Sequence, residues 1–177
     1  TILSHLDPDS PVYSTRLAQE VCSRCHDSVV INRKYDLPGQ VVDTFSAGEE
    51  IDAATLEYIH RHKTGALYRV SVRAGAILAG APEDRLNSLT RYAEHLGLAF
   101  QIKDDILDIE GDEKKLGKPV GSDIKNKKAT YPALYGMERS REKARESVDM
   151  AIEALADFGP EADFLRMIAG FVIERDF

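Results

Sequence analysis

The amino-acid sequence predicts an all-α protein, on the strength of two long apolar stripes and the lack of paired strand patterns. From residue 52 to about residue 78, apolar side chains recur every three or four positions, which places them on one helical face. A second stripe of the same kind runs from Pro82 to Gly111. After residue 50, no strand pattern is followed by a turn and a second strand. We therefore expect a helical bundle.

Each expected helix has signals at its ends. Asp52 is a candidate N-cap for the first helix, which is expected to stop before Pro82. Pro82 also begins the second helix, with acidic residues in the first turn, where the helix dipole favours them. Pro132 begins a third helix that is expected to continue to about Phe158. Residues 161–175 complete the bundle as a short last helix.

The first 50 residues lack this regularity. A weak helical pattern covers residues 14–24, and residues 29–31 are a candidate short strand. Cys22-x-x-Cys25-His26 matches the attachment pattern of a c-type haem, although two ordinary thiols explain the cysteines as well. A redox or metal-binding protein that uses Cys22, Cys25 and His26 is therefore a distant functional alternative.

Composition narrows the function classes. At 177 residues the chain is expected to form a single domain, residues 1–177. Its 23 basic and 30 acidic residues give a net charge of −7, which disfavours nucleic acid and anionic membranes as partners. The longest uncharged apolar stretch, residues 74–82, is too short to cross a bilayer. With no secretion signal in view, we expect a cytoplasmic protein without stable membrane insertion.

The residues that indicate chemistry gather at the end of the second helix. At 100° per residue, Gln101, Asp104, Asp105 and Asp108 share one helical face, and Asp104 and Asp108 prolong the apolar stripe inward. Three aspartates near a helix C-terminus repel one another and the helix dipole. A bound divalent cation removes that cost, and Mg²⁺ prefers carboxylate oxygens. The alternative is a solvated acidic helix end.

A second signal is the pair Lys63-Thr64 on the preceding helix. Lys63 stands in the apolar stripe, where a lysine is costly unless it is paired. A lysine beside a hydroxyl suits a diphosphate, because the lysine neutralises charge and the hydroxyl donates a hydrogen bond. The alternative is a lysine that extends to the surface or pairs with one of those aspartates at the end of the second helix. We expect Lys63 to face Asp104 across the bundle.

Several motifs together resemble one family. Gln101-x-x-Asp104-Asp105-x-x-Asp108, followed by Gly111-Asp112 and Leu116-Gly117-Lys118, resembles the second aspartate-rich region of the trans-isoprenyl diphosphate synthases. Residues 58–67, which contain Lys63-Thr64-Gly65, and residues 129–132 fit the same family. The resemblance is closest to its bacterial farnesyl and geranylgeranyl diphosphate synthases, and it covers residues 39–177.

The resemblance implies a fold, a reaction and a set of roles. It implies the all-helical isoprenoid synthase fold, of which this chain is the C-terminal part, with residues 1–38 atypical. It implies a homodimeric prenyltransferase in which Mg²⁺ assists the ionisation of an allylic diphosphate and isopentenyl diphosphate attacks the cation. Asp104 would bind Mg²⁺ directly, Asp105 and Asp108 would support that site, and Asp123 would act through a water. The residues implied to hold the allylic diphosphate are Lys63, Thr64, Gln101, Lys118 and Lys128, with Lys63 and Asp104 as the catalytic pair.

The sequence also departs from the family. The family's first aspartate-rich motif and its upstream basic residues for isopentenyl diphosphate have no counterpart in these 177 residues. We therefore expect this chain alone to be inactive in chain elongation. The alternative function is that of a non-catalytic, prenyl-synthase-like subunit or binding partner.

Overall fold

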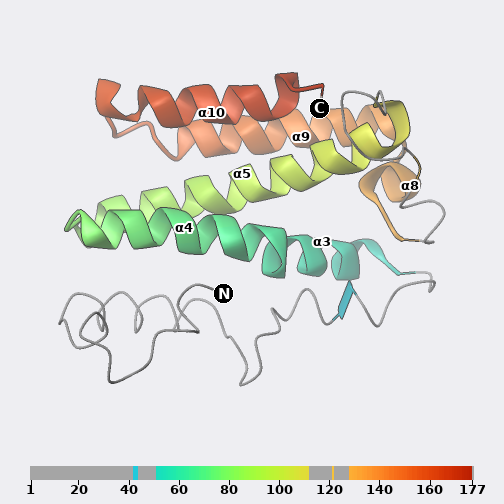
Figure 1. Ribbon diagram of the computed structural model, residues 1–177, viewed down its shortest axis with the longest axis horizontal. Coiled ribbons are helices and arrows are strands. Elements are labelled where there is room, and N and C mark those ends of the chain that lie inside the picture. Colours follow the sequence, from blue (N-terminus) through green and yellow to red (C-terminus); the bar gives the residue numbers. More distant parts are fainter. Residues whose placement is uncertain (1–41, 44–50, 112–120, 122–127, 177) are drawn as a thin grey trace.

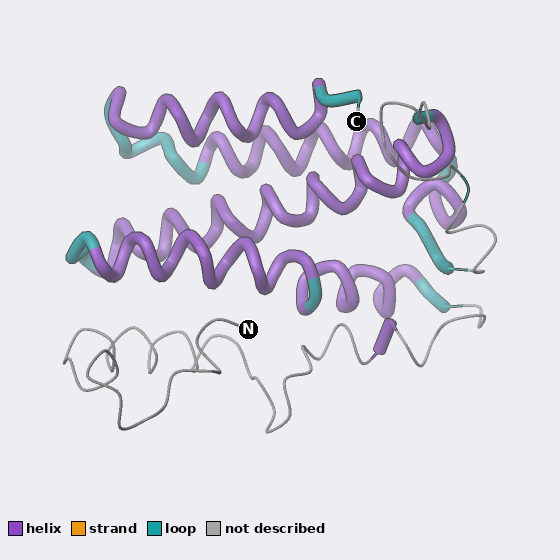
Figure 2. Tube along the Cα trace, in the orientation of Figure 1, coloured by secondary structure: helices purple, strands orange, loops and turns teal. Residues whose placement is uncertain are grey.

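The protein is described by a computed structural model that covers residues 42–43, 51–111, 121 and 128–176 (Figure 1). The helices in chain order are α3 (Ala53–His62), α4 (Thr64–Leu78), α5 (Glu83–Glu110), α8 (Tyr131–Tyr135), α9 (Met137–Glu153) and α10 (Asp163–Glu174). A short 3₁₀ turn, η2 (Pro160–Ala162), precedes α10. The described residues contain no strand, so the all-α prediction is confirmed (Figure 2). The patterns at residues 14–24 and 29–31 lie outside the described residues.

Helix α5 is the centre of the bundle. It packs against α4 on one side and α9 on the other, and α10 contacts both α9 and α5. Figure 1 shows α3 and α4 nearly in line below α5, with α9 and α10 above it. The main core lies between α5, α9 and α10. Its fully buried members are Tyr92, Leu96, Ala99, Val148, Ala151, Leu155, Ala162, Ala169 and Val172.

The first predicted helix is in fact two helices, so that prediction was wrong. Asp52 caps α3 as expected, accepting a hydrogen bond from the Thr55 backbone N–H at 2.8 Å. Lys63 then leaves the helical conformation, with φ −105° and ψ −84°, and α4 begins at the next residue. This one non-helical residue divides the expected helix in two, and both parts still pack against α5. The apolar spacing continues through the interruption and does not reveal it.

The second predicted helix is confirmed, whereas the third and fourth needed correction. Helix α5 ends at Glu110 and is capped by Gly111. The expected helix from Pro132 to Phe158 is divided by Gly136, whose φ of +78° favours glycine and separates α8 from α9. Helix α9 stops at Glu153, and α10 starts at Asp163 rather than at residue 161.

Helices α4 and α5 approach each other at a pair of glycines. A Cβ atom placed on Gly97 would lie 2.9 Å from the Cα of Gly65 and 3.4 Å from the Cβ of Tyr68. The first distance is shorter than any ordinary carbon–carbon contact, so the crossing requires glycine at position 97. This close approach brings the start of α4 beside the second half of α5.

The turn between α9 and α10 is held by one arginine. Arg166 donates hydrogen bonds to the carbonyl oxygens of Leu155, Phe158 and Gly159, at 2.7 to 3.0 Å. Tyr92 on α5 donates to the carbonyl of Leu165 at 2.8 Å. Because these contacts fix α10 against α5, they also place the residues that follow α10 near the end of α5.

No helix in the described ranges is long and apolar enough to span a membrane.

Candidate functional site

A chain of hydrogen bonds joins α4, α5 and α8. Thr64 donates from its hydroxyl to Gln101 Oε1 at 2.8 Å, and Gln101 Nε2 donates to Asp105 Oδ1 at 3.1 Å. The backbone N–H of Tyr131 donates to the other carboxylate oxygen, Oδ2, at 3.0 Å. A carboxylate can only accept, so Asp105 orients the amide of Gln101 with its nitrogen inward and its oxygen toward Thr64. The Lys63-Thr64 pair and the polar face of α5 that begins at Gln101 are therefore adjacent in the fold, as the hydrogen bond from Thr64 to Gln101 shows.

Lys63 is the single non-helical residue between α3 and α4. Its Nζ lies 2.5 Å from Asp43 Oδ2, and its side chain is 32% exposed. The printed ion pair of Lys63 is therefore with Asp43, rather than with one of the aspartates of α5 that the alternative interpretation named. An ammonium has three donors, so the contact with Asp43 leaves donors for a ligand.

Asp104 lies at the more open side of α5. Its side chain is 34% exposed, and its Oδ1 lies 4.0 Å from Arg175 Nη2. The Arg175 guanidinium stacks over the ring of Phe100 at 4.3 Å and donates to the Phe100 carbonyl at 3.4 Å. Burial lowers the pKa of Arg175. Sequence reasoning missed Arg175, because a single arginine after the last helix has no periodic signal.

Asp105 and Asp108 differ from Asp104 because they are buried, at 3% and 1% exposure. The inward direction expected for Asp104 and Asp108 is confirmed for Asp108, whereas Asp104 remains 34% exposed. A fully solvated acidic helix end is excluded for Asp105 and Asp108. The carbonyl of Asp108 accepts a hydrogen bond from the Gly121 backbone N–H at 2.7 Å. Gly121 has a φ of +74°, which suits a glycine, and its contact brings the chain back to the end of α5.

His60 is a second residue that sequence reasoning missed. Its side chain is 5% exposed, its ring stacks on Tyr131, and its Nε2 lies 3.9 Å from Asp105 Oδ2. Burial lowers the pKa of His60 to about 3, which the charge of Lys63 reinforces and that of Asp43 opposes. The imidazole is therefore neutral at neutral pH. The sequence feature that could have identified His60 is its position on the buried face of α3, four residues after Leu56.

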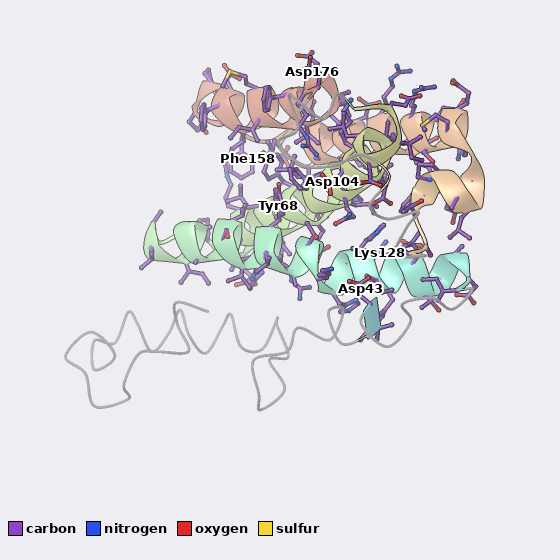
Figure 3. The ribbon with its side chains drawn as sticks, turned by 45° about the vertical axis from the view of Figure 1, so that its right-hand side comes forward. Asp43, Tyr68, Asp104, Lys128, Phe158 and Asp176 are labelled. Atoms are coloured by element: carbon purple, nitrogen blue, oxygen red, sulfur yellow. The ribbon has the colours of Figure 1, made fainter. Side chains whose placement is uncertain are left out.

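Of the remaining predicted residues, Lys128 alone is among the described residues. Lys128 is exposed on the segment that precedes α8, and Figure 3 labels it lower in the view than Asp104 on α5. Lys118 and Asp123 lie outside the described residues, as do Cys22, Cys25 and His26. Within the described ranges, no three acidic, histidine or cysteine side chains are grouped closely enough to hold a metal ion by themselves.

A pocket of about 130 Å³ opens beside the glycine crossing, lined by Gly65, Leu98 and charged side chains. Arg69 and Glu94 in its wall form an ion pair at 3.2 Å. None of the predicted site residues lines this pocket. The candidate site is therefore defined by the hydrogen-bond chain from Thr64 to Asp105, together with Lys63 and Asp104.

Known structures share this fold. An FPP/GFPP synthase from Zymomonas mobilis superposes with a TM-score of 0.68 at 32% identity, over 89% of this chain and 50% of that one. A polyprenyl synthase from Caulobacter crescentus superposes with a TM-score of 0.79 at 24% identity, over 92% of this chain and 60% of the other. The architecture is the all-α fold of the isoprenoid synthases.

Sequence comparison then assigns the family. Residues 26–166 match the family model described as Polyprenyl synthetase, and the chain belongs to that family. It is 47% identical over 138 residues to a farnesyl diphosphate synthase from Geobacillus stearothermophilus, covering 78% of this chain and 46% of that protein. It is also 47% identical over 139 residues to a geranylgeranyl diphosphate synthase from Cyanophora paradoxa, with the same coverage. The chain thus spans about half the length of these curated relatives.

Proposed function

We propose that this chain provides the allylic-diphosphate side of a Mg²⁺-dependent prenyltransferase, which condenses isopentenyl diphosphate with an allylic diphosphate. Farnesyl or geranylgeranyl diphosphate would be the product, since relatives at 47% identity carry those names. The observation that carries the proposal is the hydrogen-bond chain from Thr64 through Gln101 to Asp105. It joins a hydroxyl, an amide and a carboxylate at one helix crossing, and Lys63 directly precedes Thr64 in the chain.

The donors at this crossing suit a diphosphate. Lys63 supplies a positive charge close to where the leaving group becomes more negative, which stabilises the transition state for ionisation. Gln101 uses one amide N–H on Asp105, so its second N–H is available to a ligand. The Thr64 hydroxyl already donates its hydrogen bond to Gln101 Oε1, so in this arrangement Thr64 orients the amide. Lys118 and Lys128 would add positive charge from the loop that follows α5.

The carboxylates fit an ion shared with the substrate. Both oxygens of Asp105 accept hydrogen bonds, whereas Asp104 is partly exposed. Mg²⁺ commonly keeps several waters and takes one or two carboxylates together with substrate phosphates. Asp104 would therefore be the direct ligand, with Asp105 and Asp108 supporting from the interior and Asp123 acting through water. When bound, Mg²⁺ would offset the negative charge that develops on the leaving diphosphate.

A matched pair of variants tests the site. Asp104→Ala should abolish Mg²⁺-dependent binding of inorganic diphosphate, measured by isothermal titration calorimetry. Asp84→Ala removes an exposed carboxylate from the first turn of the same helix and should leave binding unchanged. Equal losses in both variants would show that general charge, rather than a defined site, governs binding.

Chain elongation requires a separate test. We propose that these 177 residues bind an allylic diphosphate without elongating its prenyl chain. The reason is that the family's first aspartate-rich motif, which would face this site across the cavity, has no counterpart in them. Isopentenyl diphosphate carrying a radiolabel should yield no prenyl product with protein whose mass matches these residues. Robust Mg²⁺-dependent product would refute this. Binding that never leads to turnover, even in a protein extended to the relatives' full length, would favour the non-catalytic subunit.

We further propose that the protein is a cytoplasmic homodimer. Association is supported by large apolar side chains at the surface of the described residues, such as Leu67 at 54% and Phe164 at 65% exposure. Light scattering coupled to size-exclusion chromatography should give twice the monomer mass. A monomer at micromolar concentration would contradict the proposal.

A further inference from the structure

His60 lies where α3, α5 and α8 meet, and its ring is held in a fixed plane. The ring centres of His60 and Tyr131 are 5.3 Å apart and their planes differ by 16°. Tyr131 is itself buried in an apolar cluster with Leu56, Ile102 and Ile106. Because the cluster surrounds one partner of the stack, the imidazole has little freedom to turn.

The edge of this ring is directed at Asp105. His60 Nε2 lies 3.9 Å from Asp105 Oδ2, which is too long for a hydrogen bond and acts as a charge–dipole contact. A carboxylate that only accepts is attracted to Nε2 if that nitrogen carries the ring proton. Nδ1 is then the lone-pair nitrogen, and it is buried without a hydrogen-bond partner among the described residues.

Nitrogen atoms from α5, α8 and α3 therefore approach the Asp105 carboxylate. Gln101 Nε2 comes from α5, the Tyr131 N–H from α8, and His60 Nε2 from α3. His60 Nε2 approaches Oδ2 from α3. At 3.9 Å it adds no hydrogen bond that would compete with those from Gln101 and Tyr131.

We propose that His60 is a positioning residue, whose Nε2–H holds the Asp105 carboxylate in the orientation that fixes the amide of Gln101 toward the diphosphate. The inference rests on the proposed function, because the ligand of Gln101 belongs to it. It concerns orientation rather than contact: His60 acts on the ligand through Asp105 and Gln101. Groups that orient the residues of a binding site typically change affinity 10- to 100-fold when they are removed.

Three substitutions of His60 separate its possible contributions. His60→Phe keeps an aromatic ring that can stack on Tyr131, but it removes the N–H donor. His60→Gln places an amide N–H near the position of Nε2, whereas His60→Asn places one near the position of Nδ1. We expect His60→Phe and His60→Asn to weaken Mg²⁺-dependent binding of inorganic diphosphate by about 10-fold or more. His60→Gln should bind within about 3-fold of the wild-type protein, because it restores the donor at the right place.

A structural role alone predicts a different order. If His60 only fills space, His60→Phe should be the best tolerated variant, and His60→Gln should bind no better than His60→Asn. That order would overturn the proposal. Thermal unfolding followed by circular dichroism checks that the compared variants are folded at the temperature of the titration.

A second measurement needs no ligand. Nitrogen-15 NMR of the wild-type protein should show His60 as the neutral tautomer protonated at Nε2, and a proton at Nδ1 would overturn the proposal. If the wild-type protein does not bind diphosphate, the proposed function fails by that result. The tautomer, together with the side-chain amide resonances of Gln101 in wild-type and His60→Phe proteins, then still decides whether His60 orients Asp105. Unchanged Gln101 resonances would refute the positioning role.

Discussion

Replacing Gly97 by alanine tests the helix crossing on which the candidate site depends. The added Cβ would lie 2.9 Å from Gly65 Cα and 3.5 Å from Gly65 N, so α4 and α5 must move apart or bend. Carbon atoms pack at about 3.5 to 4.0 Å, so the required shift is roughly 0.6 to 1 Å. Overpacking of this kind costs about 1 to 3 kcal/mol. Alanine also gains about 1 kcal/mol over glycine within a helix, which offsets part of that cost.

Gly75→Ala is the matched control for this substitution. Gly75 also lies inside a helix, α4, and a Cβ on it would meet nothing within 4 Å. It gains the same helix propensity without the steric cost, so it should stabilise the protein by roughly 0.5 to 1 kcal/mol. The difference between the two variants isolates the crossing, because the propensity gain cancels. We expect Gly97→Ala to be less stable than Gly75→Ala by about 1 to 3 kcal/mol.

Urea unfolding followed by circular dichroism measures that difference. Separation of the helices should also lengthen the hydrogen bond from Thr64 to Gln101, now 2.8 Å, and weaken diphosphate binding in Gly97→Ala alone. Equal unfolding free energies for the two variants would refute the reasoning, since they would show that α4 and α5 do not meet at Gly97. Loss of stability with full diphosphate binding would instead refute the link between the crossing and the site.

Three further predictions concern the packing that supports the site. Burial raises the pKa of Tyr92 from 10.0 to about 12, so the folded protein keeps the phenol proton at pH values where the unfolded chain has lost it. The free energy of unfolding should therefore fall as the pH rises from 10 to 12. The fall should be about 2 to 3 kcal/mol larger in the wild-type protein than in Tyr92→Phe, and urea titrations at each pH measure it. Thr130→Ala removes the N-cap side chain of α8 and should cost about 1 kcal/mol in the same assay, whereas a cost near zero would mean that α8 needs no cap. Arg166→Met leaves three carbonyl groups at the α9–α10 turn without their donor and should cost about 2 kcal/mol or more, while Arg139→Met, on the exposed face of α9, should leave the unfolding midpoint unchanged.

Features set by neighbouring residues were predictable from sequence. Pro82 and Gly111 bound the second helix in the sequence, and α5 runs from Glu83 to Glu110. Helical spacing likewise placed Asp104, Asp105 and Asp108 on one face and turned Asp108 inward, where it is 1% exposed. These inferences succeed because caps and the 3.6-residue period are local properties of the chain. The positions that fold differently, Lys63 and Gly136, each involve a single residue that interrupts a helix without changing the apolar pattern around it.

What only the tertiary structure decided is which distant side chains meet. Thr64 reaches Gln101 because the glycines at 65 and 97 let two helices approach, and no local pattern encodes a crossing 37 residues apart. The same holds for Arg175 beside Asp104, since α10 must first be fixed against α5. The sequence by itself determined the all-α class, the bounds of α5, its acidic face and the residue types suited to a diphosphate. Their assembly depends on where helices are interrupted and where they cross, which is set by long-range packing that periodicity does not contain.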